Sequence, residues 1–382
     1  MWNKKKLEDL AKKHAPHSVS ILIPTERAGE EVLNEKHKLH LKNQIREVEN
    51  KLENYKLNRN EIDNFLEDIR NLMDNKSIWR NASDGLAVYK SGDKLEYETL
   101  PVKFESFNYI ADHLYLKPLI PVIDSDVSFF LLTLSLKSVQ LYECTRYGIQ
   151  SIQIENLVPE ELEKVVGYDY EQKNLQVRGQ QTGTGSPMYH GQGAGKDDKK
   201  PEIEKFLQYV NKGLMNYLRD FNKPLVVASV EYLYAMFRDI SHYKNIYPEP
   251  IPGNPEHELP GLLLEKARPV TKKLYEESIG NAINKYNEAV TAGKSLPGIE
   301  NVVPAAVSGR VDTLFVRDDI NIWGRYNMET GKVELHEEKN AGNACLLNLA
   351  AVHTMLNGGK VYNLPIDDLP EKNTNVNALL RF

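Results

Sequence analysis

The sequence predicts a mixed α/β protein built from three domains. Segments with the 3.6-residue period of helices alternate with apolar, β-branched runs along most of the chain. Its 382 residues exceed the roughly 150 residues that one hydrophobic core typically serves. The predicted divisions are an N-terminal α/β domain over residues 1–122, a middle domain over 123–245 and a C-terminal α/β domain over 246–382.

The first domain is predicted to open with a buried strand over residues 18–24. Apolar side chains at steps of three and four then indicate one helix over residues 37–55 and another over 62–73. Ser91-Gly92-Asp93 lies between two β-rich runs and predicts a hairpin. Two prolines within residues 117–121 favour an extended connector over a helix.

The middle domain is predicted to begin with a meander of three strands and to end with a helix and a fully apolar strand of the buried type. Pro159 stands near the first turn of a further helix, where its missing N–H costs nothing. The predicted strands are residues 127–134, 138–142, 149–154 and 224–229, and the later helix spans 203–221.

The last domain is predicted to follow a stiff, proline-rich segment between domains, over residues 248–260. A long helix extends to about residue 292, and Gly358-Gly359 is expected to end a later one. The remaining predicted elements are a strand at 311–316, a hairpin of 320–326 and 332–336, a helix at 343–356, and strands at 360–364 and 378–382.

Composition limits the classes of function. A net charge of −6 excludes attachment to nucleic acid through bulk charge alone, although local basic patches remain allowed. Cys144 and Cys345 are too few for a disulfide framework and are expected as small core residues. His257-Glu258 lacks a second histidine at the spacing of a zinc site, so we expect no metal and no cofactor. Without an apolar signal segment or a bilayer-length apolar run, we expect a cytoplasmic protein that does not bind membranes.

A glycine-rich segment over residues 178–198 carries the functional interpretation. No Ile, Leu or Val occurs between Val177 and Ile203, so this segment cannot pack as a core element. Its six glycines allow positive φ angles and a close approach by another molecule. Loops of this length inside a domain are typically either functional or disordered, and both interpretations stay open here. The functional one is a slightly basic arm that enters an RNA-lined crevice.

A phosphate-binding loop is disfavoured by spacing. Gly195-Lys196 is followed by Asp197, where a P-loop requires Ser or Thr, and the position five before Gly195 is His190 rather than glycine. The glycines also do not form a dinucleotide fingerprint, and no apolar strand leads directly into them.

Arg178-Gly179-Gln180 and Gly191-Gln192-Gly193 in this segment resemble the catalytic loop of archaeo-eukaryotic class I peptide release factors and Pelota. The chain as a whole resembles the bacterial archaeo-eukaryotic release-factor-like proteins. The resemblance implies a ribonuclease-H-like middle domain, a C-terminal α/β sandwich like those of kink-turn-binding ribosomal proteins, and a divergent N-terminal domain. The segments that carry it are residues 19–25, 190–198, 309–316, 358–365 and 378–382.

In that family a Gly-Gly-Gln tip positions water against the ester that joins peptide to tRNA. The resemblance implies that Gly191 and Gln192 match the second glycine and the glutamine, while His190 replaces the first glycine. Histidine disfavours glycine-only backbone angles, so His190 is interpreted either as a general acid or base or as a contact residue. Gln180 and Gln181, which follow Gly179, offer an alternative tip at Arg178-Gly179-Gln180, which leaves the register open. The residues expected to contact RNA are Arg178, Gly179, Gln180, Tyr189, Gly193 and Lys196.

Two functions follow from this resemblance. The first is a ribosome-associated protein that promotes hydrolysis of peptidyl-tRNA in the rescue of stalled ribosomes. Its partners would be ribosomal RNA and peptidyl-tRNA, with a protein partner at the C-terminal domain. The second is a non-catalytic ribosome- or RNA-binding factor of stress or hibernation. A free-standing hydrolase that uses His190 is weaker, because no Ser or Cys nucleophile is paired with it.

Overall fold

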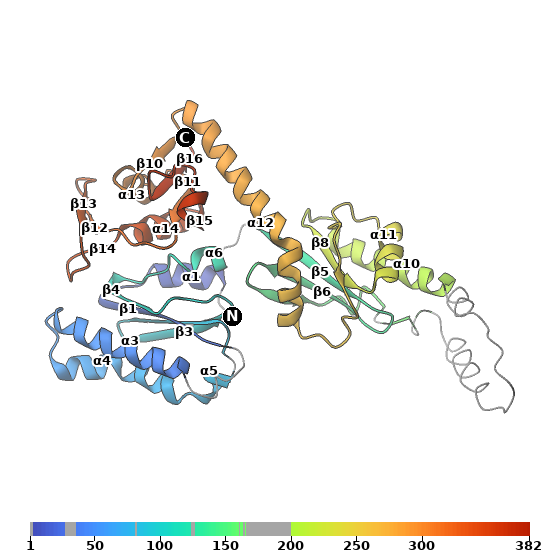
Figure 1. Ribbon diagram of the computed structural model, residues 1–382, viewed down its shortest axis with the longest axis horizontal. Coiled ribbons are helices and arrows are strands. Elements are labelled where there is room, and N and C mark those ends of the chain that lie inside the picture. The colour runs from blue at the N-terminus through green and yellow to red at the C-terminus, as the bar shows by residue number, and fades with distance from the viewer. Residues whose placement is uncertain are drawn as a thin grey trace. The chain divides into compact units, whose positions relative to one another are not determined.

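The computed structural model describes residues 3–26, 36–80, 82–123, 127–159, 161, 162, 165 and 200–382. The chain forms two compact units (Figure 1). The first unit comprises Met1–Asp126 together with Glu276–Phe382, and the second comprises Val127–Tyr275. Both units combine helices with sheets, which confirms the mixed α/β class.

The first sheet of the first unit has four antiparallel strands in the order β3-β2-β1-β4. Helices α3 and α4 pack on one face of it, and their buried stripes confirm both helices predicted from apolar spacing. The predicted hairpin is also confirmed, and Gly92 adopts a φ of 57° in its turn, which a glycine tolerates. The strands are β1 (His14–Pro24), β2 (Gly85–Ser91), β3 (Lys94–Leu100) and β4 (Phe107–His113), and the helices are α3 (Lys36–Glu53) and α4 (Arg59–Asn71).

The connector at residues 117–121 differs from the extended segment that its prolines predicted. Helix α6 (Ile120–Ile123) begins there. Pro121 lies in its first turn, where a backbone N–H would have no helical acceptor. Lys117 is buried, and its Nζ donates hydrogen bonds to three backbone carbonyl oxygens from the last part of the chain. These oxygens belong to Arg317, Asp318 and Ile320, at 3.0, 3.2 and 2.8 Å.

The second sheet of the first unit has the order β10-β16-β11-β15, in which β11 runs parallel to β15 and antiparallel to β16. The hairpin of β12 and β13 forms a separate three-stranded sheet together with β14, in the order β13-β12-β14. The predicted strands, hairpin and helix of this region are confirmed. The strands are β10 (Ser295–Pro297), β11 (Val311–Arg317), β12 (Trp323–Tyr326), β13 (Val333–His336), β14 (Ala344–Cys345), β15 (Lys360–Leu364) and β16 (Val376–Leu380), and the helices are α13 (Ile299–Val307) and α14 (Leu346–Leu356).

The two ends of the chain share one hydrophobic core within the first unit. Leu7 and Leu10 of α1 (Lys4–Ala11) belong to the same buried cluster as Leu347 and Ala350 of α14. Because this cluster also contains residues of both sheets, the N-terminal and C-terminal parts stabilise each other.

The sheet of the second unit has the order β7-β6-β5-β8-β9. The first three strands form the predicted antiparallel meander, whereas β8 and β9 continue in parallel from β5. Helices α10 and α11 cover one face, and the start of α12 covers the other. Burial on both faces explains why β5 and β8 are continuous apolar runs. The strands are β5 (Ser128–Leu134), β6 (Val139–Thr145), β7 (Ile149–Ile152), β8 (Leu225–Ser229) and β9 (Ile251–Pro252), and the helices are α10 (Lys200–Leu218), α11 (Glu231–Ile240) and α12 (Pro260–Thr291).

The proline-rich segment was predicted to separate domains, but it lies in the sheet of the second unit. Ile246 forms a parallel bridge with Leu225, and β9 pairs in parallel with β8. Pro252 is tolerated because β9 is an edge strand, where a missing N–H does not interrupt the ladder. The second unit therefore extends to Tyr275, beyond the expected boundary at 245. The division into three domains stays a prediction.

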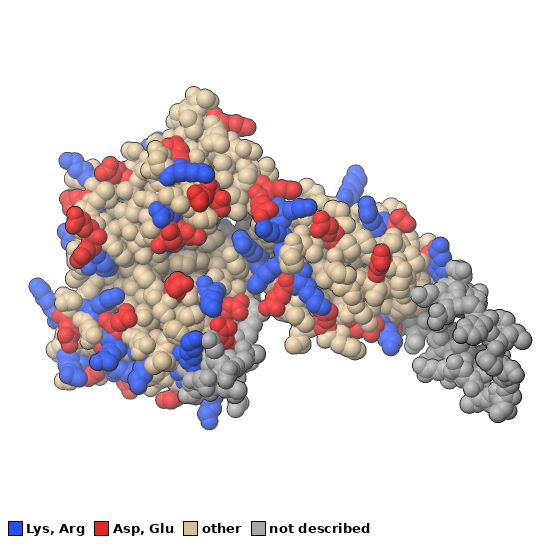
Figure 2. All heavy atoms as spheres, in the orientation of Figure 1, with Lys and Arg blue, Asp and Glu red and all other residues tan. Residues whose placement is uncertain are grey.

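Both cysteines are buried with free thiols, as expected of small core residues. Burial raises the pKa of the Cys144 thiol, which disfavours a reactive thiolate. In the described part of the chain, no helix combines the length and the apolar character needed to span a bilayer. Acidic and basic side chains are interspersed over the face of the first unit that Figure 2 shows, in keeping with the small net charge.

Candidate functional site

The residues predicted to form the catalytic tip and the RNA-contacting loop lie outside the described residues. The predicted helix that begins near Pro159 also falls mostly outside them. The tip residues concerned are His190, Gly191 and Gln192, and the loop residues are Arg178, Gly179, Gln180, Tyr189, Gly193 and Lys196.

The described residues on either side of this loop are anchored on one core of the second unit. Ile154 and Val158, which precede the loop, belong to the same buried cluster as Phe206 and Leu207 of α10, which follows it. Gly213 of α10 makes this close approach possible. A Cβ at Gly213 would lie 2.0 Å from the carbonyl oxygen of Leu157, so only glycine fits there. The described residues nearest to the predicted loop on either side are therefore fixed in one core.

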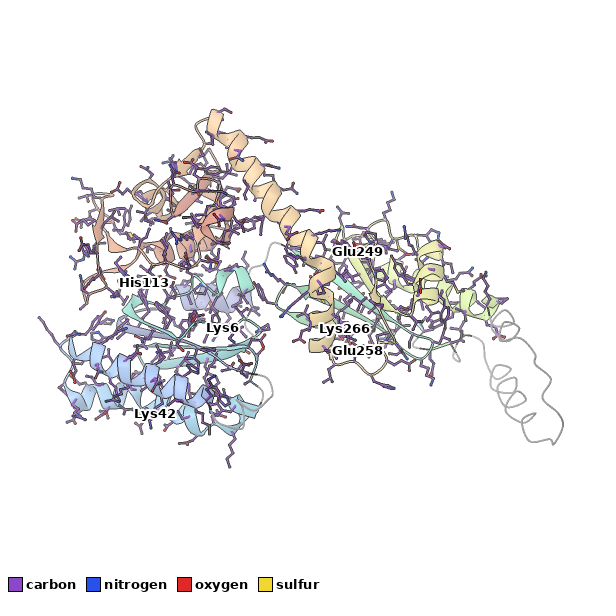
Figure 3. All side chains as sticks on the ribbon, in the orientation of Figure 1. Lys6, Lys42, His113, Glu249, Glu258 and Lys266 are labelled. Carbon is purple, nitrogen blue, oxygen red and sulfur yellow. The ribbon has the colours of Figure 1, made fainter. Side chains whose placement is uncertain are left out.

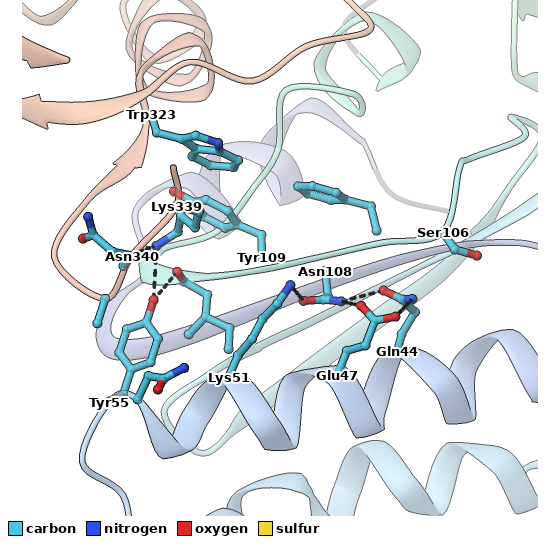
Figure 4. A pocket seen from close by; sticks show the side chains of 14 residues that line it. Gln44, Glu47, Lys51, Tyr55, Ser106, Asn108, Tyr109, Trp323, Lys339 and Asn340 are labelled. Carbon is cyan, nitrogen blue, oxygen red and sulfur yellow. Dashed lines mark hydrogen bonds between the residues drawn. The ribbon is translucent and has the colours of Figure 1, made fainter. Parts of the chain in front are cut away.

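A second candidate site is a cavity of about 400 Å³ in the first unit (Figure 4). Three segments line it: the α3 helix with the residues that follow it, the start of β4, and the chain from β12 to just beyond β13. No single stretch of sequence contains this site, because the segments are joined only by the fold.

The floor of the cavity is a hydrogen-bonded network around Asn108, which is 6% exposed. The Asn108 amide nitrogen donates to Gln44 Oε1 and to Glu47 Oε2, both at 2.7 Å. Lys51 Nζ donates to Asn108 Oδ1 at 2.6 Å, and the Gln44 amide donates to Glu47 Oε1 at 3.3 Å. Each group orients its neighbour, so the floor is fixed before any ligand arrives.

Aromatic rings form the wall of the cavity. Tyr109 stacks on Trp323, with ring centroids 6.2 Å apart and planes at 17°. The Tyr109 hydroxyl accepts a hydrogen bond from the backbone N–H of Cys345 at 3.2 Å. Phe107 also lines the cavity and contacts Tyr115, with centroids 4.8 Å apart. Trp323 and Phe107 are only half-buried, so parts of both rings face the cavity.

Lys339 closes one side of the cavity and holds its wall in place. Its Nζ donates to the Tyr55 hydroxyl at 3.1 Å and to the carbonyl oxygens of Asn340 and Asn343 at 2.6 and 2.8 Å. The Tyr55 hydroxyl donates in turn to the Ile110 carbonyl oxygen at 2.8 Å. All three N–H groups of the Lys339 ammonium are thus used within the protein.

The charges at the cavity perturb one another. Burial and, to a smaller extent, the nearby charge of Lys51 lower the pKa of Lys339 to about 8, while Asp112 opposes the shift. Burial also lowers the pKa of Lys51, and Glu47 opposes that shift. Burial raises the pKa of Tyr55 to about 12, with Asp112 adding to the effect. Two ammonium groups therefore lie close enough to repel each other.

Sequence reasoning missed this cavity. Apolar spacing predicted α3 only as a helix packed by one stripe, and Lys42 and Arg46 outside that stripe are exposed (Lys42 is labelled in Figure 3). The overlooked signal was polar residues at buried positions. Gln44 lies on the apolar stripe of α3 and is 5% exposed, and Asn108 interrupts an apolar strand.

The comparisons with known proteins point to the second unit. Residues 129–273 match the model of bacterial archaeo-eukaryotic release factor family 7. This match contains the sheet of the second unit and the glycine-rich segment, and it confirms the release-factor-like resemblance. No curated protein matches the chain.

Solved structures match most or all of the chain, but only at low sequence identity and low TM-score. Archaeoglobus fulgidus Pelota is 16% identical over 78% of this chain and 79% of its own, with a TM-score of 0.32. Dom34 of S. cerevisiae, described as a translation termination-like factor involved in RNA quality control, is 12% identical over 80% and 86%, with a TM-score of 0.32. The archaeal translation termination factor aRF1 is 15% identical over 100% and 99%, with a TM-score of 0.25.

Proposed function

We propose that this protein acts on the ribosome as a release-factor-like protein. The observation that carries the proposal is the family match over residues 129–273, because it includes the Gly191-Gln192-Gly193 segment. The packing of Gly213 against Leu157 is consistent with it, since the described residues on both sides of that segment share one core. The proposed partners are ribosomal RNA and peptidyl-tRNA, together with a protein partner at the C-terminal domain.

The proposed reaction is hydrolysis of the peptidyl-tRNA ester in the rescue of stalled ribosomes. Water attacks the ester carbonyl, a tetrahedral oxyanion forms, and the tRNA 3′ oxygen leaves with a proton. Gln192 would orient the water through its side-chain amide, and backbone N–H groups at Gly191 and Gly193 would stabilise the oxyanion. No strongly basic side chain is needed for this step.

A non-catalytic role on the ribosome is the second candidate, and His190 favours it. A side chain at this position restricts the backbone angles that two consecutive glycines would allow. In that case His190 and Tyr189 would contact RNA by stacking, and the protein would occupy the site rather than hydrolyse the ester.

Two measurements test the proposal. Co-sedimentation with bacterial ribosomes at low and moderate salt tests docking, and a protein that remains in the supernatant under both conditions contradicts either role. Release of labelled peptide from stalled complexes tests chemistry. We expect Gln192→Ala to reduce release strongly, and Gln208→Ala, an exposed glutamine of α10 outside both candidate tips, to leave it unchanged.

Two further variants settle the register and the role of histidine. If Gln180→Ala loses peptide release and Gln192→Ala does not, the catalytic tip is assigned to Gln180. If His190→Gly increases peptide release, the histidine restrains a catalytic loop. Ribosome binding without release in any version, His190→Gly included, would favour the non-catalytic role.

A further inference from the structure

The cavity of the first unit lies outside the family match and has no assigned role. Its volume of about 400 Å³ lies within the range of roughly 300–1,000 Å³ that is usual for small-molecule sites. The network around Asn108 and the hydrogen bonds of Lys339 hold its floor and side in place. The site is therefore built in advance, which lowers the entropic cost of binding.

The side-chain acceptors of the cavity floor already accept hydrogen bonds within the protein. Both carboxylate oxygens of Glu47 already accept protein N–H groups, from Gln44 and Asn108. Lys51 donates to Asn108 Oδ1, which leaves two of its three N–H groups without a protein partner among the described residues. The complementary ligand carries an anionic oxygen acceptor, which would also reduce the repulsion between Lys51 and Lys339.

The aromatic wall of the cavity is complementary to a ligand with a planar, apolar surface. Trp323 is held by its stacking on Tyr109, and both Trp323 and Phe107 expose ring surface to the cavity. Aromatic walls of this kind bind nucleobases, because every base offers a π-face for stacking. A ligand that satisfies both walls has a flat ring and a phosphate separated by a short linker.

We propose that this cavity binds a nucleoside monophosphate, with its base against Trp323 and Phe107 and its phosphate at Lys51. The same chemistry is available from a free nucleotide and from an unstacked nucleotide of single-stranded RNA. The site is independent of the loop that carries the proposed function, because its lining residues all come from the first unit.

The test is calorimetric titration of the full-length protein with AMP, GMP, CMP and UMP, alongside adenosine, inorganic phosphate and a short single-stranded RNA. We expect at least one monophosphate to bind, and its nucleoside to bind about tenfold or more weakly, since a charge-assisted hydrogen bond is lost. Lys51→Gln should weaken binding of the monophosphate by a similar factor and leave binding of the nucleoside unchanged. Trp323→Leu should weaken binding of both ligands.

Lys42→Gln is the matched control, because Lys42 is exposed on the same helix and does not line the cavity. Circular dichroism of each variant confirms that it folds. RNA that binds in a Lys51- and Trp323-dependent way while free nucleotides do not identifies RNA as the source. The proposal is overturned if no nucleotide or RNA binds, if the nucleoside binds as tightly as its phosphate, or if binding is indifferent to both substitutions.

Discussion

The two candidate sites differ in how the chain assembles them. The proposed catalytic segment of the second unit is contiguous, so its glycines and glutamine can be read directly from the sequence. The cavity of the first unit combines residues around 44–55, 106–110 and 323–341, which only the fold brings together. The first kind of site resembles a known family, and the second kind is recognised by its geometry. A protein can carry both, and a search by motif finds only one.

The largest expected effect separates the two sites by function. Gln192→Ala should reduce peptide release by about 10²- to 10³-fold, a loss comparable to removal of one group that stabilises the transition state. The same variant should bind nucleotides as the parent protein does, because the cavity lies in the first unit. Single-turnover release and calorimetry on one preparation measure both properties. A parallel loss of both would contradict their independence.

The next effect concerns the base of the proposed catalytic segment. Gly213→Ala places a Cβ only 2.0 Å from the Leu157 carbonyl oxygen, so the backbone of α10 or of Leu157 must shift. We expect a loss of about 3 kcal/mol in the free energy of unfolding of the second unit, measured by denaturant titration. Gly261→Ala in the part of α12 that belongs to the second unit is the control, because no neighbouring atom lies within 4 Å of its Cβ position. An unchanged stability for Gly213→Ala would show that α10 and Leu157 separate readily.

The third effect concerns a buried side-chain amide that links the N-terminal and C-terminal parts of the first unit. Asn348 of α14 accepts hydrogen bonds from the N–H groups of Leu116 and Lys117 at 2.7 and 2.9 Å, and donates to the Leu114 carbonyl at 3.0 Å. Asn348→Ala leaves these buried groups unpaired, and we expect a loss of about 2 kcal/mol in the free energy of unfolding. Asn301→Ala, which removes one exposed hydrogen bond, should cost less than about 0.5 kcal/mol. Equal effects would mean that the join is not stabilised by this amide.

The smallest effect is a dependence on pH. Since burial lowers the pKa of Lys339 to about 8, the folded protein binds fewer protons than the unfolded chain between pH 8 and about 10. The contribution of Lys339 to the free energy of unfolding should therefore rise over this window, while the buried Cys144 and Cys345 thiols, whose pKa values burial raises, act in the opposite direction. Lys339→Met should remove the Lys339 contribution, so the difference in stability between the parent and this variant should grow with pH, whereas Lys332→Met on the exposed hairpin should follow the parent.

A competing titration defines the upper limit of that measurement. The pKa of Tyr55 is raised to about 12, so ionisation of the unfolded tyrosine lowers stability above about pH 10. Thermal or chemical unfolding of the parent and both variants from pH 7 to 10 checks the prediction. A difference in stability between the parent and Lys339→Met that stays constant between pH 8 and 10 would contradict it.

The sequence by itself determined most of the elements and the contiguous segment. Apolar spacing predicted α3, α4 and α10, and the meander, the hairpins and α14 were read from local runs and turns. Local signals suffice here because the period of buried side chains is set by helix and strand geometry alone. The glycine-rich segment was found for the same reason, since its composition excludes a core.

Only the tertiary structure decided the rest. Pro121 was interpreted as part of an extended connector and Pro252 as part of a stiff segment between domains. Yet Pro121 lies in the first turn of a helix and Pro252 on an edge strand, positions that depend on neighbouring segments. The core shared by α1 and α14, and the cavity floor at Asn108, join residues hundreds or tens of positions apart. Such contacts leave no periodic trace in the sequence, because their energy comes from partners that local geometry does not specify.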